Sequence, residues 1–297
     1  MNLLDIIKKA RKEKRAIGHF NVGSFDMLKA VSHVAEKLDA PIVIGVSEGE
    51  RAYLGVHHTA DMIRSYNKEH GQQLFLNADH TRTVEGAREA ARAGCDMIVF
   101  DAADKPFPEN VRLTREAVIA AKRARRGVVM EGELGYIGGS SSVFDAFPQG
   151  VVIREEDMPT PDMAARFVKE TGVDLLAPAV GNVHGMIRPS AGGGSSSGGN
   201  PALSIGRIRE LRSAVAAPLV LHGGSGISDA DMRAAVQAGI AMVHISTELR
   251  LTWRRALEEA LAARPEEFTP YKLMPGVLDA MEELITGKMK LFGWSHD

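Results

Sequence analysis

The stretch that decides the fold is QLFLNADHTRTVEGAREAARAGCDMIVFD, which runs from residue 73 to residue 101. Its two ends, 73–79 and 96–101, are short apolar runs of the kind that form buried strands. Between them, the segment 83–94 repeats small apolar residues at helical spacing and ends in Gly94. A strand, a helix and another strand in this order predict one βα unit of a parallel sheet.

The same alternation recurs outward from this stretch along the whole chain. The candidate strands are 18–22, 41–47, 73–79, 96–101, 127–133, 174–180, 218–222 and 241–246. Helical segments such as DADMRAAVQAG (229–239) lie between them. About eight βα units leave two architectures, an open doubly wound sheet or a closed barrel.

Polar residues close almost every candidate strand, and they favour the barrel. These residues are Asn21, Ser47, Asp79, His80, Asp101, Glu133, His184, His222 and His244. A barrel gathers all its strand ends around one mouth, whereas an open sheet spreads them along an edge. We therefore predict an α/β fold, a single eight-stranded parallel β/α (TIM) barrel that spans residues 1–297 as one domain.

One segment, SAGGGSSSGGN at 190–200, is too rich in glycine and serine to pack against a core. It is either a passive flexible loop or a mobile lid. Its place after the strand that leads to His184 favours the lid.

Composition limits the partners. Lys and Arg total 36 against 38 Asp and Glu, a net charge of −2, which predicts no nucleic-acid partner and no anionic membrane surface. No apolar run approaches the ~18–20 residues of a membrane span, and the N-terminal segment lacks the apolar stretch of a signal peptide. The single cysteine, Cys95, forms no internal disulfide, so we expect a cytoplasmic protein.

Histidines at strand ends predict a metal site. His80, His184, His222 and His244 each follow a candidate strand, where side chains project into the mouth. A single buried histidine is more often a packing residue, but three or four imidazoles at one mouth favour a catalytic Zn²⁺, which takes three protein ligands. Most of the remaining histidines have no motif around them, and we interpret them as surface or packing residues. They are His33, His57, His58, His70 and His296.

Glycines beside two of these histidines predict a phosphate site. Gly185 follows His184, and GGSG at 223–226 follows His222. Successive backbone N–H groups in such turns cradle anions, and barrels often bind phosphate after their seventh and eighth strands, here near the helix that follows Ser228. We also expect Asn21 and Ser246, at the ends of the first and last candidate strands, to bind substrate.

Carboxylates at the mouth offer proton transfer. Asp79 precedes His80 and is either a general base or a group that orients an imidazole. Glu131 and Glu133 face the same side of one strand, either paired inward near a cation or outward as a solvated edge. No candidate strand contains lysine, which disfavours Schiff-base catalysis and leaves metal-assisted chemistry.

These motifs resemble the class II, metal-dependent ketose-bisphosphate aldolases. The resemblance rests on segments that match in order along nearly the whole chain. They are HFNV, LNADHT, VFDAADKPFPENVRLT, VMEGELGYIGG, FVKETGVDLLAPAVGNVHG, LVLHGGSGI and GIAMVHISTELR.

The resemblance implies a role for each matching position. His80, His184 and His222 would hold Zn²⁺ or another divalent metal, with Asp101 and Glu133 as auxiliary carboxylates. Asp79 would transfer the proton. The phosphate of the dihydroxyacetone phosphate half would lie at Gly185, Gly223, Gly224, Ser225 and Thr247, beside a monovalent cation (Na⁺ or K⁺). Ser47 and Arg250 would reach the distal phosphate, and because this arginine usually comes from a neighbouring subunit, a homodimer or homotetramer is expected.

Three departures from the family pattern bear on specificity. His244 replaces the usual Asn, so the hydrogen bond that this Asn gives to the reacting carbons either comes from imidazole or is lost, and metal binding by His244 is a further alternative. Ser246 replaces the Asp of fructose-type members and looks more like the tagatose-type pattern. Ser140–Ser142 replace an acidic residue, which leaves Tyr136, Asp145, Glu155 and Glu156 as alternative proton donors.

The resemblance therefore implies reversible cleavage of a ketose 1,6-bisphosphate, fructose or tagatose, to dihydroxyacetone phosphate and glyceraldehyde 3-phosphate. A metal-dependent epimerase or isomerase of sugar phosphates is an alternative, because it needs the same groups. A barrel that binds sugar phosphates without turning them over is a second alternative.

Overall fold

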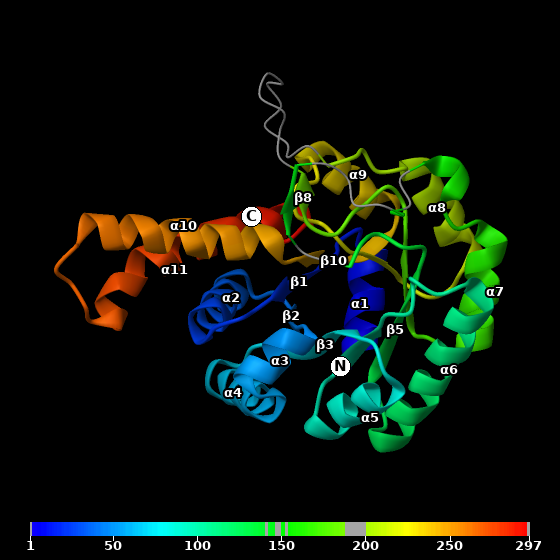
Figure 1. Ribbon diagram of the computed structural model, residues 1–297, viewed down its shortest axis with the longest axis horizontal. Helices are drawn as coiled ribbons and strands as arrows, with labels where there is room; N and C mark the ends of the chain where they lie inside the picture. The colour runs from blue at the N-terminus through cyan, green and yellow to red at the C-terminus, as the bar shows by residue number, and fades with distance from the viewer. Residues whose placement is uncertain (1, 140–141, 146–149, 152–153, 188–199, 296–297) are drawn as a thin grey trace.

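The chain folds as a closed β/α barrel with helices outside it (Figure 1). The computed structural model describes residues 2–139, 142–145, 150–151, 154–187 and 200–295. Within them, parallel strands close in the order β1-β10-β9-β7-β5-β4-β3-β2. The barrel strands are β1 (Ile17–Asn21), β2 (Ile42–Val46), β3 (Leu74–Thr81), β4 (Met97–Phe100), β5 (Val129–Leu134), β7 (Leu175–Pro178), β9 (Leu219–Leu221) and β10 (Ile240–Ile245). Each candidate strand overlaps one of them, so the predicted TIM barrel is confirmed.

The connections between strands are helices. They are α2 (Phe25–Leu38), α3 (Glu48–Leu54), α4 (Val56–His70), α5 (Val84–Ala93), α6 (Phe107–Ala124), α7 (Pro161–Thr171), α8 (Ile205–Ala214) and α9 (Asp229–Ala238), followed by α10 (Thr247–Ala263) and α11 (Pro270–Leu291) after the last strand. Serine or threonine side chains cap several of their first turns, as Thr83 does for α5. In the part of the chain that the structure describes, no helix has the length and apolar character needed to span a membrane.

A small second sheet was not predicted. It pairs β6 (Val143–Phe144) with β8 (Met186–Ile187), and a short 3-10 helix, η1 (Glu155–Asp157), precedes α7. Two-residue strands carry no alternation that a sequence pattern can detect, so they follow from tertiary contacts alone.

The helix α1 (Leu3–Lys12) closes the end of the barrel opposite the mouth. It buries Leu3, Ile6 and Ile7 against apolar side chains at the beginnings of the strands, such as Ile17 and Val129. Its lysines lie on the exposed face, as expected for a solvated helix side.

The barrel interior changes from apolar to polar along its axis. Above the apolar layer that α1 covers, inward-facing positions carry His19, Asn77, Asp79, Glu131 and Glu133, all buried. Because these polar groups lie toward the carboxyl ends of the strands, where βα barrels build their sites, the mouth is the candidate functional region.

Candidate metal centre and active site

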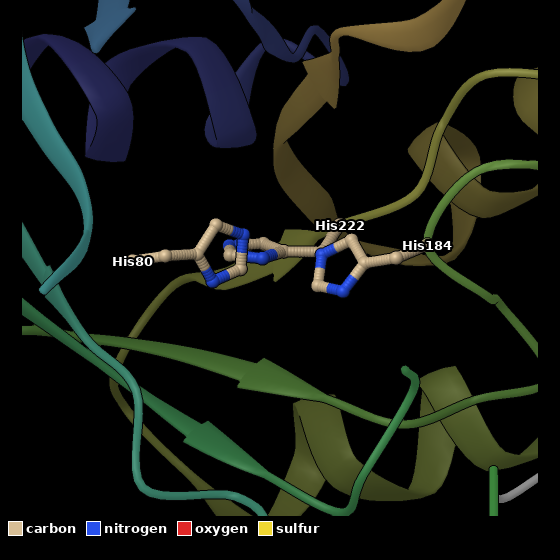
Figure 2. Close-up of side chains that lie close together, drawn as sticks. All are labelled: His80, His184 and His222. Atoms are coloured by element: carbon tan, nitrogen blue, oxygen red, sulfur yellow. The ribbon is translucent and has the colours of Figure 1, made fainter. Parts of the chain in front are cut away.

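Three imidazoles meet at the mouth of the barrel. His80 lies near the end of β3, His184 in the segment after β7, and His222 directly after β9. Figure 2 shows the three rings turned toward one another, and one nitrogen of each lies within 4.8 Å of the others. The three histidines predicted as metal ligands are therefore brought together.

A hydrogen bond or ion pair holds the opposite nitrogen of each ring. Nδ1 of His184 donates to the carbonyl oxygen of Gly138 at 2.5 Å, and Nε2 of His222 donates to Oε1 of Glu131 at 2.6 Å. Nδ1 of His80 lies 3.2 Å from a carboxylate oxygen of Asp101 and 3.0 Å from one of Glu133. Such partners fix the ring and the position of its proton, leaving the other nitrogen as a lone-pair donor.

The backbone at His80 explains how two consecutive residues both reach the site. The register between β3 and β4 shifts between Ala78 and Thr81, and His80 has a left-handed φ of 45°. On a regular strand, His80 would face away from the barrel interior that Asp79 faces. The bulge re-aims the imidazole toward the mouth, at a cost of roughly 1–3 kcal/mol for the sparsely populated conformation.

The donor set suits a divalent metal ion. Nδ1 of His222 is buried without a hydrogen-bond partner among the described residues, and its nearest charged atom there is Oε1 of Glu133, at 3.7 Å. A buried nitrogen without a partner is costly unless something binds it. Three imidazoles with an open side toward a cavity form a ligand set that catalytic Zn²⁺ commonly takes.

Carboxylates make this region favourable for a cation. Burial alone would lower the pKa of His80, but the charges of Asp79 and Glu133 raise that pKa well above its ordinary value. Burial and the nearby His80 lower the pKa of His184 to about 3, so that its imidazole is neutral, the form that binds metal. A metal ion would thus take the place that a proton on His80 otherwise fills.

Asp79 is oriented from two sides. Its Oδ2 accepts a hydrogen bond from Nδ2 of Asn21 at 2.9 Å, and its Oδ1 lies 3.5 Å from Nδ1 of His244. Burial alone would raise the pKa of Asp79, but His80 and His244 hold it well below its ordinary value, so the carboxylate is ionised. Both readings of Asp79, as a base and as a group beside an imidazole, fit this position.

Two cavities meet at the triad. The outer cavity, about 280 Å³, is lined by Ser47, Arg82, Arg250 and the loop at Gly138, and the inner one, about 20 Å³, by Asp79, His244 and the glycine-serine turns. His80 and His184 line both. A bound molecule can therefore extend from the inner cavity past the triad into the outer one.

The inner cavity contains the predicted phosphate cradle. Its lining includes Gly185, Gly223, Ser225, Ser246 and Thr247. Residue 223 has a left-handed φ of 61°, and a Cβ atom there would collide with the carbonyl oxygen of Val183, so only glycine fits.

The helix at the cradle differs from the prediction. The expected helix near Ser228 is α9, but α10, which begins at Thr247, lines the cavity instead. The hydroxyl of Ser225 accepts hydrogen bonds from the N–H groups of Ser246 and Glu248 at 3.4 and 3.2 Å, which ties the cradle to the start of α10.

Arg250 reaches the outer cavity from the same chain. Its guanidinium donates to Oε1 of Glu50 at 2.6 Å, and Glu50 also accepts from the backbone N–H of Ser47 and from Asn21. Arg250 thus lines the outer cavity of its own chain. The contribution of this arginine to a neighbouring subunit, which the resemblance implies, stays a prediction.

Sequence reasoning missed several residues of this region. His19 is fully buried beside His244, Glu50 links Asn21 to Arg250, and Arg82 lines the outer cavity. The alternative left open for Glu131 is settled, since it points inward to His222. A signal for His19 was present in the alternation of Ile17, His19 and Asn21, which places all three inside the barrel.

The remaining expectations lie outside the site or outside the described residues. Residues 190–199 of the predicted lid and Ser140 and Ser141 are not described, whereas Asn200 is, and it donates to the carbonyl oxygen of Ser225 at 2.8 Å. Among the described linings of the two cavities, none of the four alternative proton donors occurs. His57 and His58 are exposed, and His33 pairs with Glu282 at 2.7 Å, as expected of surface residues.

Comparison with known proteins decides the family. All of residues 1–297 match the family model described as fructose-bisphosphate aldolase class-II. The chain belongs to the class II fructose-bisphosphate aldolase family. The resemblance seen in the sequence is thereby confirmed, and the chain is a class II aldolase, a carbon–carbon lyase of a metal-dependent family.

Individual relatives of this aldolase are similar to it in sequence over nearly their whole length. A probable fructose-bisphosphate aldolase of Bacillus subtilis is 32% identical over 299 residues, covering 100% of this chain and 98% of its own. The fructose-bisphosphate aldolase of Geobacillus stearothermophilus is 32% identical, covering 99% and 97%. Among solved structures, the YdjI aldolase from Escherichia coli K12 is 31% identical with a TM-score of 0.79, covering 99% of this chain and 97% of that one.

Proposed function

We propose that this aldolase cleaves a ketose 1,6-bisphosphate, fructose or tagatose 1,6-bisphosphate, reversibly to dihydroxyacetone phosphate and glyceraldehyde 3-phosphate. The observation that carries the proposal is the pair of cavities joined at His80 and His184. A substrate with a phosphate at each end needs an anion site on both sides of the reacting carbons. The glycine-serine cradle provides one, and Arg250 with Ser47 provides the other.

The three histidines would hold Zn²⁺ or another divalent metal. Asp101 and Glu133 orient His80, and Glu131 orients His222. When bound, the metal supplies Lewis-acid polarisation of the ketose carbonyl. The Na⁺ or K⁺ ion implied beside the cradle stays a prediction.

Asp79 would accept the proton in the cleavage direction. Its Oδ1 is buried without a hydrogen-bond partner among the described residues, while Asn21 occupies Oδ2. The C4 hydroxyl gives its proton to Oδ1 and becomes the aldehyde, and the C3–C4 bond breaks. The electron pair of that bond stays with the three-carbon fragment, which takes up a proton from solvent at C3, and Asp79 releases its proton to solvent to complete the cycle. His244, 3.5 Å away, would contact the reacting carbons where the family usually has Asn.

The cradle would bind the phosphate of the three-carbon half. Gly185, Gly223, Gly224 and Ser225 present backbone N–H groups and a hydroxyl, and Ser246 and Thr247 begin α10, whose N-terminal end favours anions. Ser246 is also where fructose-type and tagatose-type members differ, so the C4 preference is part of the test.

An assembly of subunits also belongs to the proposal. α10 and α11 extend beyond the barrel at the left of Figure 1, and Phe268 and Tyr271 at their junction are 89% and 74% exposed. Large exposed aromatic side chains support a homodimer or homotetramer. The mass of the protein in solution tests this directly.

Product analysis tests the proposed reaction. The zinc-loaded protein is incubated separately with fructose and tagatose 1,6-bisphosphate, and the products are separated. We expect dihydroxyacetone phosphate from at least one sugar, and the ratio of the two rates gives the C4 preference. An epimeric bisphosphate without three-carbon products would indicate an epimerase, and binding without turnover would indicate a non-catalytic barrel. Either result would overturn the proposal.

A further inference from the structure

Three imidazole rings are stacked inside the barrel. The ring of His19 lies on that of His244 with centroids 3.5 Å apart and planes inclined by 7°. On its other face, His244 stacks on His222 at 4.0 Å and 23°. His222 is one of the three histidines of the metal centre, so the stack connects that centre to a residue for which neither the family resemblance nor the proposed reaction has a role.

The strands bring these rings together. β1 and β10 are neighbours, and His19 and His244 are direct partners in their register, with both side chains inside the barrel. On the other side of β1, strand β2 carries Gly45. A Cβ atom at residue 45 would lie 2.5 Å from Nε2 of His19, which real Cβ atoms do not do. A glycine inside a strand commonly marks such a close approach, and here it leaves the space that the His19 ring fills.

A hydrogen bond fixes the edge of the His19 ring. Nδ2 of Asn77, on β3, lies 2.9 Å from Nε2 of His19, and both residues are fully buried. His19 is thus held at its edge by Asn77 and on one side by the backbone at Gly45.

His244 has no comparable hydrogen-bonded support. Both of its ring nitrogens are buried without a hydrogen-bond partner among the described residues, and its nearest charged neighbour is Oδ1 of Asp79, at 3.5 Å. The plane of its ring is therefore determined by the rings above and below it. Because His244 lines the inner cavity next to Asp79, that plane sets which atoms of a bound substrate it can contact.

We propose that His19 is a positioning residue for the aldol reaction, acting through the stack to hold His244 in the plane required beside Asp79. The inference rests on the proposed function, since it assigns a role in that reaction. His19 does not line either substrate cavity, so it acts on the chemical step and not on substrate binding. Gly45 and Asn77 serve the same purpose by holding His19.

The test compares a flat ring with an aliphatic side chain at residue 19. His19→Phe keeps a ring that can stack, and His19→Leu does not. For His19→Leu we expect kcat to fall roughly 10- to 100-fold, the range that small misplacements of catalytic groups produce, with KM within about 2-fold. His19→Phe recovers kcat to within about 3-fold of wild type, and Gly45→Ala behaves like His19→Leu. His57→Leu, at an exposed histidine of α4, is the control and keeps the wild-type kcat.

A purely structural role would give a different pattern. Phe and Leu both lack the hydrogen bond to Asn77, so a loss of stability alone would lower kcat equally in the two variants. Thermal unfolding of each variant measures that loss of stability. Equal kcat losses in His19→Phe and His19→Leu, or no loss in His19→Leu, would overturn the proposal.

A second measurement is independent of turnover. The ring protons of His244, observed by NMR in the zinc-loaded protein, should show the upfield shift of a stacked ring in wild type and His19→Phe and lose much of it in His19→Leu. Unchanged shifts in His19→Leu would contradict the positioning role even in an active enzyme. If the shifts change as expected but wild type cleaves neither bisphosphate, the proposed function fails and the assignment of His19 to catalysis fails with it, while the stack itself stands.

Discussion

Glu131 determines which nitrogen of His222 is free. The carboxylate is fully buried and accepts from Nε2 of His222 at 2.6 Å, which leaves Nδ1 for the metal. Replacing it by the isosteric amide removes the charge that stabilises this tautomer. We expect Glu131→Gln to weaken zinc binding roughly 10- to 100-fold, as loss of such a partner typically does.

Competition with a chromophoric chelator measures that affinity. Glu36→Gln is the matched control, because Glu36 pairs with the surface residue His70 at 3.6 Å, far from the mouth. Zinc affinity that is the same in both variants would show that Glu131 does not orient a ligand.

Arg250 should contribute to substrate binding more than to chemistry. It lies at the outer cavity, and a hydrogen bond to a charged group is worth about 1.5–3 kcal/mol. Arg250→Ala should therefore raise KM for the bisphosphate roughly 10- to 100-fold, with a smaller change in kcat. Steady-state kinetics with Arg254→Ala, one turn further along α10, provide the comparison. An unchanged KM in Arg250→Ala would place the second phosphate elsewhere.

At the level of residues, the sequence predicted identities better than orientations. Strand-end position was enough to find His80, His184, His222 and Asp79, because polar side chains at the ends of barrel strands gather at one mouth. It was not enough to find the bulge that turns His80, or the direction of Glu131, which depend on register between strands. His19 was missed because it lies in the interior of its strand, below the end position that drew attention to the other histidines.

Among the helices and strands, α1 is the clearest example of an element that contributes to stability and not to catalysis. Ile7 is fully buried between this helix and the apolar layer of the barrel, at the end opposite the metal centre. Ile7→Ala should lower the free energy of unfolding by about 2–5 kcal/mol. Because the cavity it leaves lies in the apolar layer, kcat of the folded enzyme should stay close to that of wild type.

Urea unfolding followed by circular dichroism measures the loss of stability. Lys8→Ala, at the next and exposed position of α1, should change the free energy of unfolding by less than about 0.5 kcal/mol. A similar small change for Ile7→Ala would mean that α1 does not close the barrel in solution.

The elements themselves were largely predictable. The eight barrel strands are mostly apolar because helices cover one face and the barrel interior the other, and their polar residues lie toward the mouth. The short strands β6 and β8 and the role of α10 at the cradle were not, since both depend on how distant segments meet. The cradle needed the start of the helix after the last strand, whereas the sequence pattern pointed to the helix directly after GGSG.

The whole molecule separates stability from function along the barrel axis. One end is apolar and covered by α1, and the other carries buried carboxylates and imidazoles that are close enough together to hold a metal ion. The closed barrel was predictable from the repetition of βα units, and the family from its motifs. The number of subunits in the assembly was not predictable, because it depends on surface residues that carry no sequence motif.

The central claim is that a divalent metal at the three histidines is required to cleave a ketose bisphosphate. The most direct measurement is the initial rate of dihydroxyacetone phosphate release from fructose and from tagatose 1,6-bisphosphate, taken before chelation, after removal of metal, and after Zn²⁺ is restored. We predict that release from the preferred sugar is lost on chelation and recovers with Zn²⁺, and that His184→Ala shows no such recovery. Release that continues unchanged in the metal-free protein would contradict this account.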